Sequence, residues 1–211
     1  MPRTRRRPAN DLRARFHRAA TRHRRGPTAT TWFALGTLFA EAAAQAPDIL
    51  QALRDEESLD QNVDAIECWR RSAKLAPKRA DIWHRLGVAY EAIDDRANAV
   101  KALTRAVKLD ARLAEAWNKL AILTLPAPGE DDLARVRRAE RYLRRAIEAD
   151  PRGRKLGWEP YAWLAEVAER RRDDPSALAW YAEANRRGDR YAAARKQVIE
   201  GHGARRRPSK R

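Results

Sequence analysis

Hydrophobic residues recur at helical intervals through the middle of the chain. Within residues 80–113, four of them stand at positions i, i+3, i+4 and i+7 of one helical face: Trp83, Leu86, Gly87 and Tyr90. A second stripe follows, in which a bulky residue stands between two small ones: Ala99, Leu103 and Ala106. The pattern predicts two antiparallel helices that pack closely, because Gly87 leaves room for the bulky residue of the second helix.

The same spacing recurs along the chain at intervals near 34 residues. The first-helix positions return at Trp117, Leu120, Ala121 and Thr124, and again at Tyr161, Leu164 and Ala165. The second-helix positions return in three further places: Ala65, Trp69 and Ser72; Ala139, Leu143 and Ala146; Ala177, Tyr181 and Ala184. Internal repetition of this length is typical of solenoids built from helix pairs. The chain is therefore predicted to contain about four such repeats, over residues 46–187.

This pattern resembles the tetratricopeptide repeat (TPR) family, whose Trp, Leu, Gly, Tyr, then Ala, bulky residue, Ala and Pro are matched most fully over residues 80–113. The resemblance implies an all-α fold, a right-handed superhelical solenoid of helix-turn-helix repeats. After the fourth repeat, residues 188–201 carry a further helical stripe at Tyr191, Ala194 and Val198. They are expected to form a capping helix over the end of the solenoid.

Two repeats depart from the regular spacing. The third holds extra residues around Pro126 and Gly129, so its second helix is expected to start near Asp131. In the first, the spacing places one helix at residues 47–57 and its partner at about 62–76.

Residues 28–46 admit two interpretations. Four residues reproduce the first-helix signature: Trp32, Leu35, Gly36 and Phe39. The second-helix positions that should follow at regular spacing are Asp48, Ala52 and Asp55, so the segment is predicted to be an extra helix over the open end of the first repeat. The alternative is that residues 1–44 contain a targeting segment, either an export signal or an organellar transit peptide.

Charge is concentrated at the two ends of the chain. The net charge is +16, yet residues 1–27 hold ten Arg against Asp11, and residues 202–211 hold five basic residues and no acid. We expect these segments to be basic arms that contact an anionic surface. Together with a basic stretch at 135–145, they supply the expected contacts: Arg5, Arg6, Arg7, Arg13, Arg15, Arg24, Arg25, Arg138, Arg141, Arg145, Arg205, Arg206 and Arg207.

Side chains suited to catalysis are sparse. The four His are scattered without metal-ligand spacing, Cys68 is the single cysteine, and no Gly-rich loop is followed by Lys-Ser or Lys-Thr. We therefore expect no enzyme activity, metal or cofactor. No uncharged apolar run reaches the roughly 20 residues of a membrane-spanning helix, which argues against a multi-span membrane protein. The expected location is cytoplasmic, or exported or organellar if residues 1–44 are a targeting segment.

The resemblance to the family implies a concave groove lined by first helices, which binds a protein or peptide partner. The groove residues that it implies in this sequence are His84, Arg85, Val88, Glu91, Glu115, Asn118, Lys119, Ile122, Trp163 and Glu166. The predicted function is a non-enzymatic protein-interaction adaptor. Two alternatives remain at this point: an RNA-associated or ribonucleoprotein subunit anchored by the basic arms, and an exported or membrane-tethered assembly factor.

Overall fold

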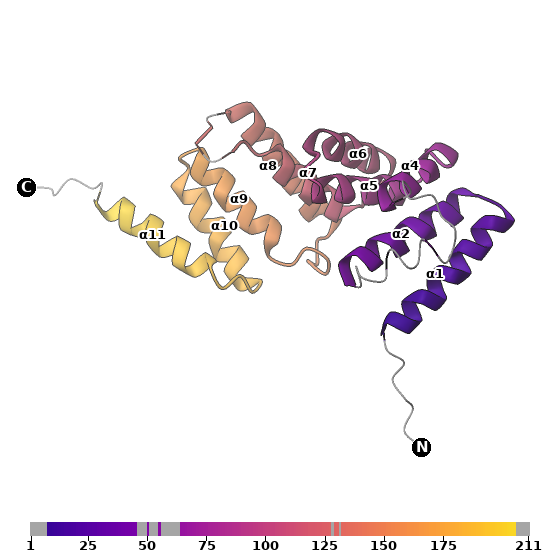
Figure 1. Ribbon diagram of the computed structural model, residues 1–211. Coiled ribbons are helices and arrows are strands. Elements are labelled where there is room, and N and C mark those ends of the chain that lie inside the picture. Colours follow the sequence, from indigo (N-terminus) through magenta and orange to yellow (C-terminus); the bar gives the residue numbers. More distant parts are fainter. Residues whose placement is uncertain are drawn as a thin grey trace, which may run out of the picture. The chain divides into compact units, whose positions relative to one another are not determined.

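The structure is a computed structural model that describes residues 8–45, 50, 55, 64–127, 129, 130 and 132–205. All regular secondary structure in these ranges is α-helical, as predicted (Figure 1). The chain divides into two compact units, Met1–Leu109 and Asp110–Arg211, here called the N-terminal and C-terminal units. The N-terminal unit holds α1 (Pro8–Arg25), α2 (Ala29–Gln45), α4 (Ala65–Leu75), α5 (Ala80–Ala92) and α6 (Arg96–Leu109). The C-terminal unit holds α7 (Ala114–Thr124), α8 (Leu133–Ala149), α9 (Glu159–Arg170), α10 (Asp174–Arg186) and α11 (Ala192–Arg205).

Helices α5 and α6 form the pair that the sequence predicts most clearly. Gly87 faces Leu103 so closely that a Cβ on Gly87 would lie 2.5 Å from Leu103 Cγ. The turn between the helices places Asp94 at φ 58°, and Asp95 then accepts a hydrogen bond from the backbone N–H of Asn98 (3.1 Å) at the start of α6. The close approach and the Asp cap explain why three residues suffice to reverse the chain.

Helices α2 and α4 form a second pair, and here the structure differs from the sequence interpretation. A Cβ on Gly36 would lie 2.8 Å from the Trp69 ring and 3.1 Å from the Ala65 carbonyl oxygen. Helix α2 therefore takes the first-helix place in front of α4, and is not an extra helix laid over the end. The predicted helix 47–57 lies outside the described residues except for Leu50 and Asp55. The regular 34-residue spacing led to the wrong assignment of α2. Close packing of two helices needs a small residue opposite a bulky one and does not depend on the number of residues between the helices.

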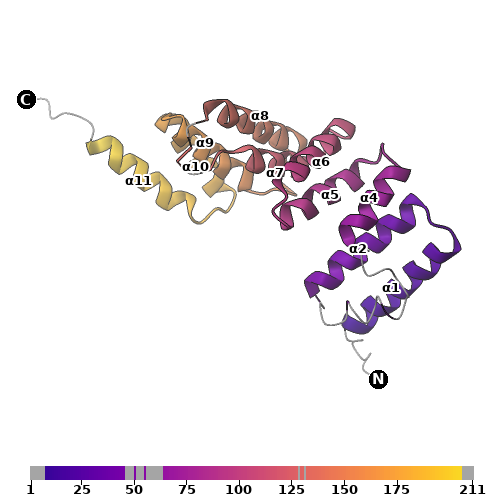
Figure 2. The same ribbon diagram turned by 45° about the horizontal axis from the view of Figure 1, so that its top comes forward.

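Helix α1 packs on α2, beside which both views show it (Figures 1 and 2). Three residues at four-residue intervals, Leu12, Phe16 and Ala20, are buried. The Phe16 and Phe39 rings meet edge to face, with centroids 5.0 Å apart. The Arg15 guanidinium donates to both Glu41 carboxylate oxygens at 2.6 and 2.7 Å. Residues 8–25, expected to be part of a basic arm, are therefore a helix whose apolar stripe joins the core of the N-terminal unit.

In the C-terminal unit, α7 pairs with α8 and α9 pairs with α10. Helix α8 begins at Leu133, where Asp132 accepts a hydrogen bond from the Arg135 N–H (2.9 Å). The Arg135 guanidinium donates to the carbonyl oxygens of Thr124 (3.1 Å) and Leu125 (3.0 Å), which anchors the chain that leaves α7. Helix α11 packs on α10, and its first residue, Ala192, is 1% exposed. A helix thus follows the fourth repeat, as expected, and runs four residues beyond the predicted end at 201.

Candidate functional site

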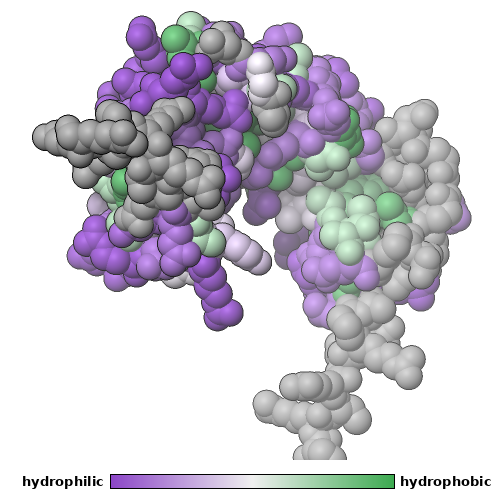
Figure 3. Space-filling model, turned by 90° about the vertical axis from the view of Figure 1, so that its left-hand side faces the viewer, coloured by the Kyte–Doolittle hydropathy of each residue, from purple (hydrophilic) through white to green (hydrophobic). Residues whose placement is uncertain are grey.

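A largely apolar groove lies in the N-terminal unit, where α2, α4 and α5 meet. It has a volume of about 510 Å³ and is here called the Val88 groove. Its walls are mostly small or aliphatic side chains, with two aromatic rings and two charged groups: Phe39, Ala40, Ala43, Ala44, Leu50, Asp64, Ala65, Ile66, Trp69, Arg85, Val88, Ala89, Ala92 and Ile93. In Figure 3, hydrophobic side chains gather in one area at the right of the view, amid a more hydrophilic surface.

Helix α5 contributes a distinct stripe to this groove. Arg85, Val88, Ala89 and Ala92 stand at i, i+3, i+4 and i+7, so they share one face of α5. The small side chains on α2 and α5 hollow the surface, and Ile93 at its edge is 61% exposed. The exposed Arg85 has no ion-pair partner within the part of the chain that the structure describes. The groove therefore offers apolar surface with two charged groups at its walls, the Arg85 cation and the Asp64 carboxylate that caps α4.

Two of the predicted groove residues on α5, Arg85 and Val88, line this groove. The other two, His84 and Glu91, are half-buried elsewhere on the same helix. Trp69, Phe39 and the α2 alanines were missed as groove residues. The signature Trp32, Leu35, Gly36 and Phe39 was the available signal, since it marks α2 as a first helix.

A second hollow, of about 690 Å³, lies in the C-terminal unit. The predicted residues Trp163 and Glu166 line it, together with Trp158, which is 40% exposed. Glu166 is already engaged, because it accepts hydrogen bonds from the Arg170 guanidinium (2.7 Å). Burial raises the pKa of the neighbouring Tyr181 to about 12, so this hydroxyl stays protonated at neutral pH. The hollow combines exposed indole surface with charges that are mostly paired.

The predicted residues on α7 are less accessible as a group. Glu115 is exposed, and Lys119 and Ile122 are half-buried. Asn118 is only 3% exposed, and its Oδ1 has no hydrogen-bond partner among the described residues. It shares the buried face of α7 with Ala114 and Ala121, one turn away on either side. The structure therefore does not present the Asn118 amide to a peptide backbone, contrary to our expectation.

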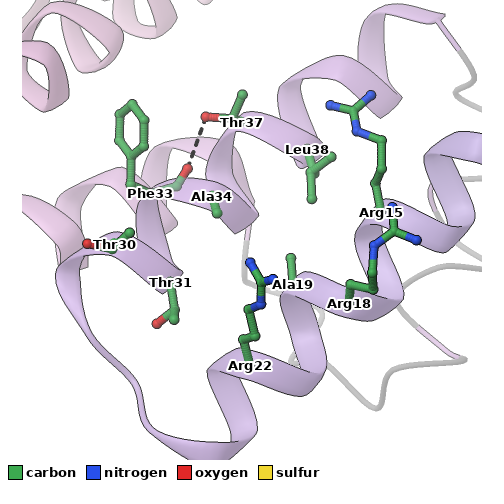
Figure 4. A pocket seen from close by; sticks show the side chains of 10 residues that line it. All are labelled: Arg15, Arg18, Ala19, Arg22, Thr30, Thr31, Phe33, Ala34, Thr37 and Leu38. Carbon is green, nitrogen blue, oxygen red and sulfur yellow. Dashed lines mark hydrogen bonds between the residues drawn. The ribbon is translucent and has the colours of Figure 1, made fainter.

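The arginines expected to contact an anionic surface have several different environments. On α1, Arg15 is engaged by Glu41, while Arg13, Arg24 and Arg25 are exposed. A hollow of about 450 Å³ lies between α1 and α2, and Arg15, Arg18 and Arg22 line it (Figure 4). Arg18 and Arg22 were not among the predicted contacts. On α8, Arg138, Arg141 and Arg145 are exposed, and Arg145 pairs with Glu148 at 3.0 Å. The remaining predicted contacts lie outside the described residues or side chains: Arg5, Arg6, Arg7, Arg205, Arg206 and Arg207.

Neither a metal site nor a membrane span emerges from the described residues. No cluster of three or more His, Cys, Asp or Glu within those ranges is arranged to hold a metal ion. None of the helices described is long and apolar enough to cross a membrane.

Comparisons with known proteins identify the fold. Residues 80–112 match the family model named Tetratricopeptide repeat. Among solved structures, the chain is similar to MamA, with a TM-score of 0.64 and 20% identity over 88% of this chain and 93% of that one. It is also similar to YrrB, described as "a TPR protein with an unusual peptide-binding site", with a TM-score of 0.62 and 14% identity over 90% of this chain and 85% of that one.

Yeast Tom70 has a TM-score of 0.60 and 15% identity, over 93% of this chain and 41% of that one. No curated protein matches the chain by sequence. TPR proteins are generally non-enzymatic and mediate protein–protein interactions. Residues 80–112 are a tetratricopeptide repeat, and the chain as a whole has the fold of tetratricopeptide repeat proteins.

Proposed function

We propose that this chain is a non-enzymatic adaptor whose Val88 groove binds a peptide segment of a protein partner. The observation that carries the proposal is the groove itself: first-helix side chains of α2 and α5 together line one largely apolar groove. Hollows lined by apolar side chains with a few polar groups are typical binding sites. The proposal also agrees with the general role of TPR proteins in protein interactions.

The chemistry of the groove indicates what kind of segment fits. Ile66, Val88 and Ile93, the more exposed apolar residues of the groove, favour aliphatic or aromatic side chains, because burial of apolar surface contributes roughly 25 cal/mol per Å². Arg85 favours a carboxylate, either from an acidic side chain or from a chain end. The preferred ligand is therefore a short segment with two or three apolar side chains and one carboxylate.

Exposed arginines add a less specific attraction in this proposal. Arg13, Arg24 and Arg25 on α1, and Arg138 and Arg141 on α8, are exposed. Clusters of one sign raise the association rate with oppositely charged partners and act less strongly at high salt. They support contact with an anionic partner surface, without adding specificity to the groove.

Selection of peptides from a random library displayed on phage, with the full chain as bait, tests this function. The dissociation constants of the selected peptides are then measured for the wild type, Val88→Asp and Arg85→Ala. The matched control is Val100→Asp on α6, where the valine is half-buried like Val88 but does not line the groove. We expect Val88→Asp to weaken binding at least about tenfold, since a carboxylate cannot be buried cheaply against apolar ligand surface, while Val100→Asp retains it.

Circular dichroism shows whether each variant keeps its helical content. Peptides that bind Val88→Asp and Arg85→Ala as tightly as the wild type would place binding elsewhere, and the groove would lose its proposed role.

A further inference from the structure

A second hollow in the N-terminal unit opens on a different face of α5. It has a volume of about 460 Å³ and is here called the Tyr90 hollow. Its floor is apolar, with Leu86, Trp83 and Tyr90 from α5 and Ala73 and Ala102 from the two flanking helices. On α5, positions 83, 86 and 90 are turned by about 140° from the stripe that lines the Val88 groove, at 100° per residue. The two surfaces are therefore separate.

Two rows of positive charge border this hollow. Arg70 and Lys74 stand one turn apart on α4, and Lys101 and Arg105 stand one turn apart on α6. All four side chains are exposed, and no Asp or Glu is among the residues that line the hollow. Like charges at i and i+4 repel each other and weaken a helix slightly.

The acids near these rows neutralise them only in part. Arg70 has the Glu67 carboxylate at 3.6 Å, and Lys101 acts electrostatically on Asp95. Lys74 and Arg105 make no ion pair or hydrogen bond within the described ranges. The hollow thus presents an apolar floor between two cationic edges.

The floor favours a protein segment over nucleic acid. Base stacking needs an open ring face, yet Trp83 and Tyr90 are both half-buried, and Trp83 Nε1 donates to the Pro77 carbonyl oxygen at 3.0 Å. The rest of the floor, Leu86, Ala73 and Ala102, is aliphatic and has no side-chain group that could donate a hydrogen bond to a phosphate. Apolar side chains flanked by carboxylates match both the floor and the edges.

We propose that the Tyr90 hollow is a second docking surface, which binds an acidic amphipathic segment of a partner protein. The apolar side chains of that segment sit over Trp83, Leu86 and Tyr90, and its carboxylates face the cationic rows on α4 and α6. This surface is independent of the Val88 groove, so one chain can hold two protein segments at once.

The test uses the full chain and three fluorescently labelled probes. The first is a synthetic helical peptide of about four turns, with Leu along one face and Glu on both flanks. The second has Lys in place of each Glu, and the third is a single-stranded oligouridylate. Fluorescence anisotropy measures the binding of each probe to the wild type and to two double variants with equal changes of net charge. Lys74→Glu/Lys101→Glu alters the rim, and Lys78→Glu/Lys108→Glu alters exposed lysines away from it.

We expect the acidic peptide to bind the wild type and the Lys78/Lys108 variant equally well, and the rim variant at least about tenfold more weakly. Val88→Asp should leave this binding unchanged, which separates it from the proposed peptide groove. Equal binding by the two double variants would show a nonspecific charge effect and overturn the proposal. It is also overturned if the acidic peptide does not bind, if the Lys peptide binds as well, or if only the oligouridylate binds and loses affinity in the rim variant.

Discussion

The two helix pairs of the N-terminal unit make the same contact through very different connections. In α5/α6, Gly87 faces Leu103, and residues 93–95 join the helices. In α2/α4, Gly36 faces Trp69, and residues 46–64 lie between them. The helix-to-helix contact is local in space and needs only a small residue opposite a bulky one. The contact is therefore made whether three residues (93–95) or 19 residues (46–64) separate the two helices in sequence.

The pairing of α2 with α4 also accounts for the position of the Val88 groove. Helix α2 brings Phe39, Ala40 and Ala43 to one wall because it occupies a first-helix place, and α5 brings Val88 and Ala89 from the next first helix. Had α2 merely covered the end of the unit, its alanine-rich face would not line the groove beside α5. Recognition of α2 as a first helix thus changes the candidate site as well as the fold.

The largest expected effect concerns α1, which packs on α2 as α4 packs on α5. Phe16 is 0% exposed and packs edge to face on Phe39, so Phe16→Ala should lower the free energy of unfolding by about 3 to 5 kcal/mol. Urea unfolding of the full chain, followed by circular dichroism, measures the change. The control is Arg18→Ala on the exposed side of α1, for which we expect a change within about 0.5 kcal/mol. Equal midpoints for both variants would mean that α1 is not part of the folded core.

A smaller effect tests whether the two pairs really share one contact. Gly36→Leu and Gly87→Leu should each destabilise the chain by about 1 to 3 kcal/mol, because each new side chain enters space held by Trp69 or Leu103. The gain in helix propensity over Gly offsets part of this loss, by somewhat under about 1 kcal/mol.

Gly26→Leu is the control for this pair of variants, since a Cβ at Gly26 would meet no atom within 4 Å. If Gly36→Leu unfolds like Gly26→Leu while Gly87→Leu is destabilised, the pairing of α2 with α4 is not equivalent to that of α5 with α6.

Most of the fold was predictable because the helical periodicity and the Gly87 and Leu103 positions repeat in the sequence. The misassigned part, residues 8–45, carries both signals as well. Leu12, Phe16 and Ala20 form a stripe, and Trp32 to Phe39 repeat the first-helix signature. The abundance of Arg on α1 favoured the interpretation of this segment as a basic arm or a transit peptide, and the requirement for regular spacing led away from the pairing of α2 with α4. Charge density says little about order when an apolar face is present on the same helix.

The candidate site was less predictable than the fold. Arg85 and Val88 line the Val88 groove because their positions on α5 fix the direction in which they point, and their role in peptide binding stays a prediction. Asn118 on α7 corresponds, by the 34-residue spacing, to His84, which does not line the groove either, and Asn118 is buried. The Tyr90 hollow was not anticipated at all. It combines residues from three helices, and no single stretch of the sequence displays its two cationic rows together.

The smallest expected effect is a pH dependence of the unfolding free energy that comes from Asp95, the residue that caps α6 in the α5/α6 pair. The hydrogen bond from the Asn98 side chain (2.7 Å), together with that from the Asn98 backbone N–H, lowers the pKa of Asp95 from its usual value near 3.8. Because the pKa is depressed in the folded state, the ionised cap stabilises the protein at pH values above the unfolded-state pKa. This stability is lost as the pH falls through the folded-state pKa.

Asp95→Asn keeps a capping side chain without a titrating group. The difference in unfolding free energy between wild type and Asp95→Asn should therefore shift in favour of the variant as the pH falls from about 5 to about 2. Because every other carboxyl group is the same in both proteins, urea unfolding across this range isolates Asp95, and a difference that stays constant with pH would show that its ionised form adds no stability to the turn between α5 and α6.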